Sequence, residues 1–275
     1  MNKSFSMKDA IVDTESRHVL GLSGGKDSAA LAIYIKDKYP SLHEKMEYFS
    51  SDTGAELKEV YDFLDKLEAY LGKEIKRLSS ERTFEHWLKI HNDFLPSPRQ
   101  RWCTRVMKIK PFEEYVANDS VISYIGIRAD ENREGYISQK QTIKPLFPFI
   151  EDGLVRDDIF QILEDSVGVP EYYKWRSRSG CYFCFFQRQD EWLGLKRNHP
   201  ELFKKARDIE ISSGAGYTWV KDKTLDEVVA HAEEKEKKRN LIYPAMEKTS
   251  PRWQDSLRQS DDDDPEDQAC LICSL

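Results

Sequence analysis

The first residues able to carry chemistry in this 275-residue chain are in the stretch SGGKDS, residues 23–28. The stretch follows a short apolar run and precedes an amphipathic segment, so it is expected between a strand and a helix. Two glycines let the backbone approach an anion, and the free N–H groups at a helix start favour negative charge. The pattern predicts a phosphate-binding turn with Lys26 and Asp27 as its charged side chains.

Two familiar phosphate-binding motifs do not fit this turn. Walker A aligned on Gly25 and Lys26 places Leu20 where glycine is required and Asp27 where a hydroxyl is required. The GxGxxG fingerprint of dinucleotide-binding folds is also absent. The alternative without a ligand is an ordinary strand-to-helix turn whose hydroxyl caps the helix.

Cysteines are the second group of candidate functional residues. Cys103 lies in RWCTRVMKIKP, and Cys181 and Cys184 form a CxxC in SGCYFCFFQRQ. Five cysteines at these spacings do not suggest a disulfide framework, whereas a CxxC suits zinc, a redox pair or an iron-sulfur site. The aromatic neighbours of the CxxC indicate a shielded site, and buried free thiols are the structural alternative. Cys270 and Cys273 lie in the terminal CLICSL.

The elements that must position these residues alternate between strand and helix. Strands are expected at 17–22, 47–53, 74–80 and 121–130, and helices at 26–39, 55–71 (ended by Gly72), 82–91 and 105–116. This alternation predicts an α/β fold with a doubly wound parallel sheet of about five strands.

The pattern changes to mostly helix from about residue 150. Helices are expected at 156–168, 188–210 and 224–242, with the CxxC loop between the first two. We therefore expect a nucleotide-binding α/β domain at 1–150, a helical appendage with the CxxC loop at 151–255 and an acidic, disordered tail at 256–275.

Charge is distributed unevenly along the chain. The net charge is −7, but residues 260–275 hold six acidic and no basic residues, and subtracting those six leaves −1 for the rest. Basic residues cluster at 98–110 and 174–189, which favours an anionic substrate or nucleic acid, with a solvated charged face as the alternative. Neither a membrane span nor a signal peptide is recognisable, so a cytoplasmic protein without membrane contact is expected.

SGGKDS resembles the PP-loop of the N-type ATP pyrophosphatases, the adenine-nucleotide alpha-hydrolase superfamily. The resemblance implies that the turn cradles the β- and γ-phosphates of ATP as a pyrophosphate leaving group, with Mg²⁺. The residues of this cradle would be Ser23, Gly24, Gly25, Lys26, Asp27 and Ser28.

Two further stretches resemble the phosphoadenylyl-sulfate reductase branch of this superfamily. SDTG matches that branch's DTG, which implies nucleotide-pocket roles for Asp52, Thr53 and Gly54, and a weaker one for Glu56. GIRADENREGY matches its GxRxxES stretch, which places Arg128 at the ligand-facing end of the sheet with Asp130, Glu131 and Arg133 beside it. Arg128 could hold a phosphate or sulfate through a bidentate fork, or form a surface salt bridge.

The cysteine segments resemble those of reductase-like PP-loop enzymes, closest to the sulfur-transfer enzymes of DNA phosphorothioation. The resemblance implies a 4Fe-4S cluster on Cys103, Cys181 and Cys184, with zinc as the alternative. Thr104 stands where assimilatory adenylyl-sulfate reductases have a second cysteine, so the fourth ligand is open, and Cys270 or Cys273 could supply it. In cluster-free reductases a tail cysteine attacks the sulfonucleotide, but within a motif that CLICSL does not match.

These features favour an ATP-dependent sulfurtransferase, with Lys26, Asp27 and Arg128 as catalytic residues. It would adenylate an oxygen of its substrate, which is expected to be DNA, release pyrophosphate and then insert sulfur from a cysteine desulfurase or another donor. The alternatives are a phosphoadenylyl-sulfate or adenylyl-sulfate reductase and, third, a nucleotide-binding subunit of a defence complex. A homo-oligomer is compatible with each of them.

Overall fold

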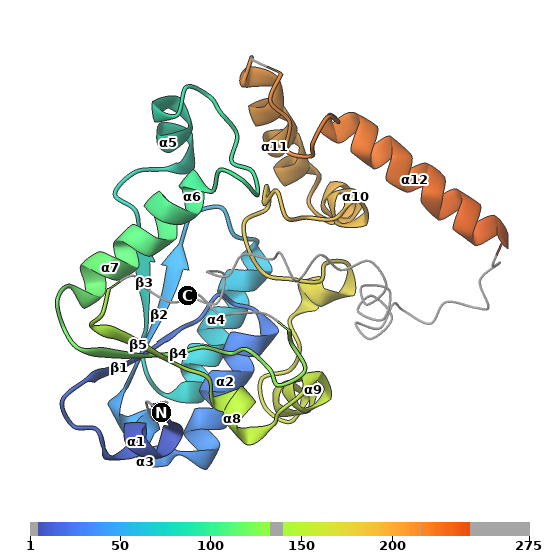
Figure 1. Cartoon of the computed structure of the whole chain (residues 1–275). Coiled ribbons are helices and arrows are strands. Elements are labelled where there is room, and N and C mark those ends of the chain that lie inside the picture. Colours follow the sequence, from blue (N-terminus) through green and yellow to red (C-terminus); the bar gives the residue numbers. More distant parts are fainter. Residues whose placement is uncertain (1–4, 133–139, 215, 243–275) are drawn as a thin grey trace.

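A five-stranded parallel sheet forms the centre of the chain (Figure 1). The computed structural model describes residues 5–132, 140–214 and 216–242. The strands are β1 (Arg17–Gly21), β2 (Met46–Asp52), β3 (Ile75–Ser79), β4 (Val121–Tyr124) and β5 (Ile143–Leu146), in the order β3-β2-β1-β4-β5. All neighbouring strands run parallel, which confirms the expected doubly wound α/β fold.

Helices cover both faces of the sheet because successive strand residues point to opposite sides. Leu20 belongs to the larger core with α2 (Lys26–Lys38), α4 (Lys58–Leu71) and α9 (Arg156–Glu164), whereas Val19 belongs to a smaller cluster under α7 (Lys110–Val116). In that smaller cluster the rings of Phe49 and Phe112 stack with centroids 4.9 Å apart. The near-continuous burial of the strands follows from this double cover.

The strand order reverses between β1 and β4. From β1 the chain moves outward to β2 and β3, whereas from β4 it moves the other way to β5. Ligands of such sheets bind at the carboxyl ends of the strands beside this switch point. The turn at 23–28 and the loop at 125–131 leave the two strands there, so the fold brings both predicted ligand segments to one edge.

The largest differences between the predicted and the observed bounds concern one strand and one helix. The strand expected at 121–130 ends at Tyr124, and beyond it Gly126 packs closely on the start of α2, where an added Cβ would lie 3.0 Å from the Asp27 carbonyl oxygen. The helix expected at 188–210 is two helices, α10 (Gln189–Asn198) and α11 (Pro200–Ser212). Pro200 cannot donate a backbone hydrogen bond and clashes with the preceding turn, so it starts a new helix.

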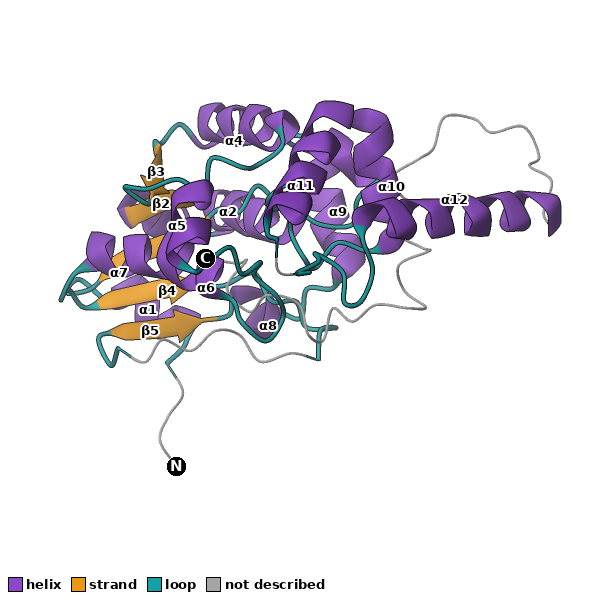
Figure 2. Cartoon of the chain, turned by 90° about the horizontal axis from the view of Figure 1, so that it is seen from above, coloured by secondary structure: helices purple, strands orange, loops and turns teal. Residues whose placement is uncertain are grey.

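The remaining elements complete the layers. They are α1 (Met7–Val12), α3 (Pro40–Lys45), α5 (Phe84–Ile90), α6 (Trp102–Thr104), a π-helix (Arg105–Ile109), α8 (Pro148–Asp152), a 3₁₀ turn (Glu171–Lys174) and α12 (Leu225–Ile242). Helices α10 and α12 pack together, and α12 projects away from the sheet (Figure 2). No helix of the described residues is long and apolar enough to cross a membrane. The division into domains stays a prediction, and the acidic tail lies outside the described residues.

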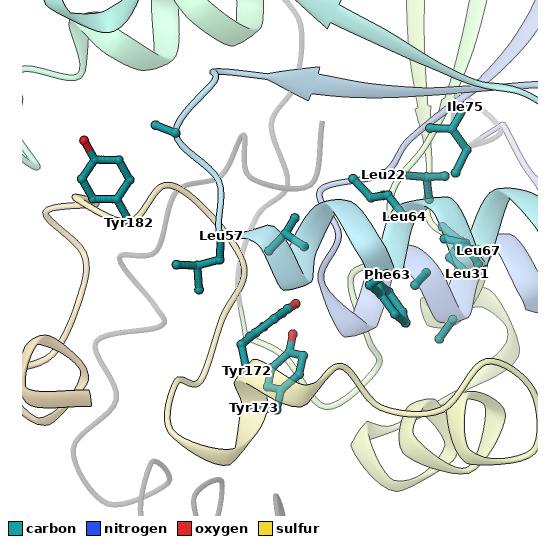
Figure 3. Close-up of a cluster of buried hydrophobic side chains, with 14 of the residues drawn as sticks. Leu22, Leu31, Leu57, Phe63, Leu64, Leu67, Ile75, Tyr172, Tyr173 and Tyr182 are labelled. Atoms are coloured by element: carbon teal, nitrogen blue, oxygen red, sulfur yellow. The ribbon is translucent and has the colours of Figure 1, made fainter. Parts of the chain in front are cut away.

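A pair of tyrosines extends the larger core beneath the SGGKDS turn. Tyr172 and Tyr173 come from the 3₁₀ turn and are 0% and 1% exposed. Figure 3 shows them side by side, reaching toward α2 and α4 among leucine side chains. Residues far apart in sequence therefore share one core at the carboxyl edge of the sheet.

Two glycines with positive φ make a matched stability test. Gly24 has a φ of +74° and an added Cβ would lie 2.6 Å from Val60 Cγ1, whereas Gly72, which ends α4, has a φ of +68° and open space around it. We expect Gly72→Ala to lower the free energy of unfolding by about 1–2 kcal/mol, the cost of left-handed backbone. Gly24→Ala should cost more, because the methyl group also overlaps Val60.

Denaturant unfolding of the single variants and of Gly24→Ala/Val60→Ala measures these costs. Removing the Val60 methyl groups should recover part of the Gly24→Ala loss and none of the Gly72→Ala loss. Equal losses for the two glycine variants in the wild-type background would contradict the close packing of α4 on the turn.

Candidate functional site

The SGGKDS turn connects β1 to the start of α2. The Ser23 N–H donates to Ser28 Oγ over 3.3 Å, and the Gly25 N–H donates to Ser23 Oγ over 3.3 Å. Gly25 is the N-cap of the 13-residue helix α2 and provides no side-chain cap. The N-terminal end of the α2 dipole therefore faces the turn, as expected for an anion-binding site.

Lys26, Asp27 and Arg128 form a buried chain of charges across the switch point. Asp27 accepts from Lys26 Nζ and from Arg128 Nη1, both over 2.9 Å. Arg128 also pairs with Asp130 at 3.0 Å and with Glu131 at 2.6 Å. The guanidinium is buried, unlike a surface salt bridge, and it ties the loop after β4 to the turn after β1. Direct phosphate binding by Arg128 stays a prediction.

These charges stabilise one another. Burial alone would raise the pKa of Asp27, but Lys26 and Arg128 lower it to about 2. Burial lowers the pKa of Arg128, yet Asp27 and Glu131 raise it by more. Asp27 is therefore ionised at neutral pH, and Lys26 is fixed beside the turn by a neighbour that stays negative.

The tyrosines of the 3₁₀ turn contact the SGGKDS backbone directly. The Tyr172 hydroxyl donates to the Gly24 carbonyl oxygen over 2.6 Å, and the Tyr173 hydroxyl accepts from the Lys26 N–H over 2.9 Å. Ser179, further along the same segment, donates to Ser23 Oγ over 3.3 Å. The segment that leads into the CxxC loop is thus bound to the turn at three points.

The SDTG loop follows β2 and is held by its own side chains. Asp52 Oδ1 accepts from the Gly54 N–H and from the Tyr61 hydroxyl, both over 2.8 Å. Gly54 adopts a φ of +70°, the left-handed backbone that favours glycine at this turn. Asp52 lines a small, partly open cavity that also reaches Ser23 and Ser179. Its remaining wall residues are Ser50, Ser51, Glu56, Val60, Tyr61, Leu64, Arg77, Lys108 and Gly180. We call it the nucleotide cavity, after the ligand that the sequence predicts for Asp52.

Thr53 and Glu56 connect this loop to the CxxC loop. Thr53 Oγ1 lies 2.7 Å from Glu56 Oε1 and 3.1 Å from Cys181 Sγ, and the Cys181 thiol lies 3.8 Å from Glu56 Oε1. Glu56 and Cys181 also form an antiparallel backbone bridge. The predicted Thr53 therefore meets the cysteine segment, while Asp52 faces the nucleotide cavity.

Cys103, Cys181 and Cys184 line a second small, partly open cavity. Its other walls, Thr53, Phe84, Pro96, Thr104, Met107, Lys108, Gly180, Phe183, Phe185 and Phe186, are largely apolar; we call it the cysteine cavity. Burial, with a contribution from Cys184, raises the pKa of the Cys103 thiol to about 12, and burial with Glu56 raises that of Cys181 well above its usual range. Without a metal or cation these two thiols stay protonated at neutral pH.

Lys108 and Gly180 line both cavities. Lys108 lies in the π-helix that follows Cys103, and its charge lowers the pKa of both Cys103 and Cys181 against the effect of burial. Single π-turns are rare and are frequent at functional sites, because the extra residue redirects side chains. The nucleotide cavity and the cysteine cavity are therefore neighbours with a cation between them.

The three thiols come from two distant segments and line one cavity with aromatic walls. Cysteine thiolates are the donors of iron-sulfur clusters and of zinc sites. Among the described residues, no group of three or more His, Cys, Asp and Glu side chains is arranged to hold a metal ion. The 4Fe-4S cluster and its zinc alternative therefore both stay predictions. Arg133, Cys270 and Cys273 lie outside the described residues.

Sequence reasoning missed several residues of the site. Lys108 could not be singled out, because helical periodicity gives no sign of the π-helix. Tyr172 and Tyr173 directly precede the basic stretch 174–189 and belong to no recognisable motif. Ser179 lay next to the CxxC but had no spacing relation to Ser23. Only the fold brings these residues to the turn.

Comparison with known proteins places these features in a family. Residues 17–147 match the phosphoadenosine phosphosulfate reductase domain. Two uncharacterized proteins of Methanocaldococcus jannaschii are similar: MJ0066, 26% identical over 74% of this chain and 44% of its own length, and MJ0973, 27% identical over 68% and 46%. The chain thus spans less than half the length of the curated relatives it matches.

Among solved structures, the crystal structure of phosphoadenylyl-sulfate (PAPS) reductase from Candida auris, in a phosphate complex, has a TM-score of 0.44 and 13% identity. That similarity covers 58% of this chain and 77% of that chain. The domain match at residues 17–147 supports the PP-loop superfamily, in its phosphoadenylyl-sulfate reductase-like branch, for that part of the chain.

Proposed function

We propose that the chain is an ATP-dependent sulfurtransferase that activates an oxygen of a nucleic-acid phosphate and replaces it with sulfur. The substrate oxygen attacks the α-phosphorus of ATP, the bond between the α-phosphorus and its bridging oxygen breaks, and pyrophosphate leaves. Sulfur at the level of hydrosulfide, supplied by a cysteine desulfurase or another donor, then attacks the activated phosphorus. AMP leaves with the original substrate oxygen.

The observation that carries this proposal is the adjacency of the two cavities. The nucleotide cavity includes Ser23 of the PP-loop and Asp52, while the cysteine cavity holds all three described cysteines, and Lys108 and Gly180 belong to both. An enzyme that couples adenylation to sulfur chemistry needs its nucleotide and its thiols within reach of one reacting group. A nucleotide-binding subunit without catalysis would not need cysteines there.

The PP-loop provides electrostatic stabilisation of the leaving pyrophosphate. The uncapped start of α2 and the Lys26 ammonium lie at the turn, where negative charge develops on the bridging oxygen. Asp27 holds Lys26 in place from the other side. Mg²⁺ bound to the phosphate oxygens would neutralise further charge, as in other phosphoryl and nucleotidyl transfers.

Cys103, Cys181 and Cys184 would hold a 4Fe-4S cluster in the cysteine cavity. When bound, such a cluster supplies a redox-active or sulfur-binding iron site. The protein's own contribution is to keep the site dry with aromatic walls and to place Lys108 between the thiols and the nucleotide. The fourth ligand is left open.

The two basic clusters of the sequence meet at the cysteine cavity, which supports a nucleic-acid substrate. Arg101 from the first cluster and Arg178 from the second lie over the ring of Phe186, 4.9 Å and 5.2 Å from its centroid. Phe186 lines the cysteine cavity. Cations that contact phosphates and an aromatic ring that stacks on bases are typical of single-strand nucleic-acid sites.

A second candidate is a sulfonucleotide reductase. The family description of residues 17–147 favours it directly. The same nucleotide cavity would then hold an adenylyl sulfate, and a thiol would attack its sulfur to release sulfite. ATP would remain uncleaved in that reaction, so the two candidates differ in a measurable product.

Lys26→Met should slow pyrophosphate release from ATP by about 100-fold or more, because it removes a charge aimed at the leaving group. The measurement is a coupled pyrophosphate assay with single-stranded DNA as acceptor. Lys58→Met removes an exposed lysine that pairs with Asp62 on α4; it is the matched control and should retain activity. Inert ATP together with sulfite release from an adenylyl sulfate would favour the reductase.

Cys103→Ser and Cys184→Ser should each lower the iron and sulfide bound after anaerobic reconstitution from about four per chain toward zero. Elemental analysis and visible absorbance provide the readout, with mock-reconstituted wild type as the control. Cys270→Ser and Cys273→Ser test the fourth ligand in the same assay. A colourless wild-type protein containing zinc would contradict the cluster assignment.

Arg101→Ala and Arg178→Ala should weaken binding of single-stranded DNA at all sequences and reduce the slope of log affinity against log salt by about 1 each. Fluorescence anisotropy across a salt series measures both quantities. Arg207→Ala, which removes an exposed arginine paired with Asp226 on the distant helices, is the control. Unchanged slopes would argue against this surface as the nucleic-acid site.

A further inference from the structure

Arg176 is a buried arginine at the base of the CxxC loop, and its side chain is only 1% exposed. Its Nη1 donates to the Gly180 carbonyl oxygen over 3.1 Å and its Nη2 to the Cys181 carbonyl oxygen over 2.8 Å. Its Nε is buried without a hydrogen-bond partner in the described part of the chain. Neutral carbonyl groups are therefore the acceptors that surround this cation.

No carboxylate of the described residues forms an ion pair with Arg176. The buried carboxylate of Glu191, which is close in sequence, is bound by the Ser177 N–H and hydroxyl over 2.6 Å and 2.7 Å and by the Arg188 N–H over 3.0 Å. A buried guanidinium without a counter-ion is expensive, and proteins usually pair such groups. The excess positive charge lies under the loop that carries two of the three site cysteines.

The carbonyl groups that Arg176 binds belong to the turn that presents Cys181 to its cavity. Gly180 has a φ of +130°, a backbone conformation open to glycine and strained for other residues. Both Gly180 and Cys181 line the cysteine cavity. Arg176 therefore fixes the peptide units on either side of this turn, and with them the direction of the Cys181 side chain.

The backbone of Arg176 is anchored toward the PP-loop. Its N–H donates to the Tyr172 carbonyl oxygen over 2.9 Å, and the Tyr172 hydroxyl donates to the Gly24 carbonyl oxygen over 2.6 Å. A continuous series of hydrogen bonds thus connects Gly24, Tyr172, Arg176 and Cys181. The cation is held in the protein scaffold and does not depend on the cavity's contents for its position.

We propose that Arg176 is the built-in counter-charge and positioning residue of the cysteine site, placed to compensate the negative charge of a thiolate-held iron-sulfur cluster. This inference rests on the cluster assignment made under the proposed function. Thiolates outnumber the positive charges of an oxidised four-iron core, so the assembled site is anionic. Arg176 acts on it through the Cys181 peptide and through its charge, and it does not touch the substrate.

Charge and hydrogen bonding can be separated by two substitutions. Arg176→Gln retains amide donors but removes the charge, whereas Arg176→Lys keeps the charge but cannot bind both carbonyl groups in the same fork. Arg197→Gln is the control, because Arg197 pairs with Glu236 on the C-terminal helices. Each full-length variant is reconstituted anaerobically, and the bound iron, the reduction potential of the cluster and thermal unfolding before reconstitution are measured.

Arg176→Gln should weaken iron retention against a chelator by about 10-fold or more and make the reduction potential more negative, because the added electron loses a nearby positive charge. Arg176→Lys should keep a potential close to wild type, with lower iron retention. Arg197→Gln should match wild type in both. A purely structural role predicts instead that Lys and Gln lower thermal stability alike and leave the potential unchanged.

The outcomes separate this inference from the proposed function. If wild type binds a cluster and Arg176→Gln has the same reduction potential and iron retention as wild type, the counter-charge role alone is overturned. Wild type that binds no cluster would overturn both the counter-charge and the cluster assignment, while pyrophosphate release in the same sample reports on adenylation independently. If Arg176→Gln fails to fold, a potential in Arg176→Lys that differs from wild type overturns the counter-charge. An unchanged potential together with wild-type thermal stability before reconstitution supports it, whereas an unchanged potential with lowered thermal stability indicates the purely structural role and overturns it.

Discussion

Two hydrogen bonds from buried tyrosines hold the second half of the chain against the PP-loop. Tyr172 binds the Gly24 carbonyl oxygen and Tyr173 binds the Lys26 N–H, and both rings are part of the main hydrophobic core. The segment that continues from them carries Ser179, Cys181 and the rest of the CxxC loop. This docking, together with the backbone bridge between Glu56 and Cys181, fixes the position of the cysteines relative to the nucleotide cavity. The relation between the two sites therefore depends on a contact that no local motif encodes.

Positively charged side chains lie on both sides of that contact. On the nucleotide side, Asp27 lies between Lys26 and Arg128 and joins the loops after β1 and β4. On the cysteine side, Lys108 lies between the cavities and Arg176 lies beneath the CxxC loop. Positive charge thus faces the places where phosphate and thiolate charge would gather. Lys26, Arg128 and Arg176 are buried, which makes their electrostatic effect larger than it would be at the surface.

Much of the fold followed from the sequence, because the parallel strands and their helices have clear periodicities and the switch-point rule places their loops together. The position of residues 23–28 between β1 and α2 likewise followed from the sequence, and the family resemblance anticipated that Cys103 would lie near the CxxC segment. Lys108, Tyr173 and Arg176 were not. A π-helix breaks the period that would orient Lys108, and the partners of Tyr173 and Arg176 are backbone atoms, which leave no trace in residue types.

The central claim is that an oxygen of the acceptor is activated with AMP before sulfur replaces it. The most direct test uses single-stranded DNA labelled with oxygen-18 at its non-bridging phosphate oxygens, incubated with the reconstituted protein, ATP, Mg²⁺ and sulfide. Mass spectrometry of the products should find one oxygen-18 atom in AMP for each sulfur atom gained by the DNA. AMP without the label, or sulfur incorporation with ATP intact, would contradict the account.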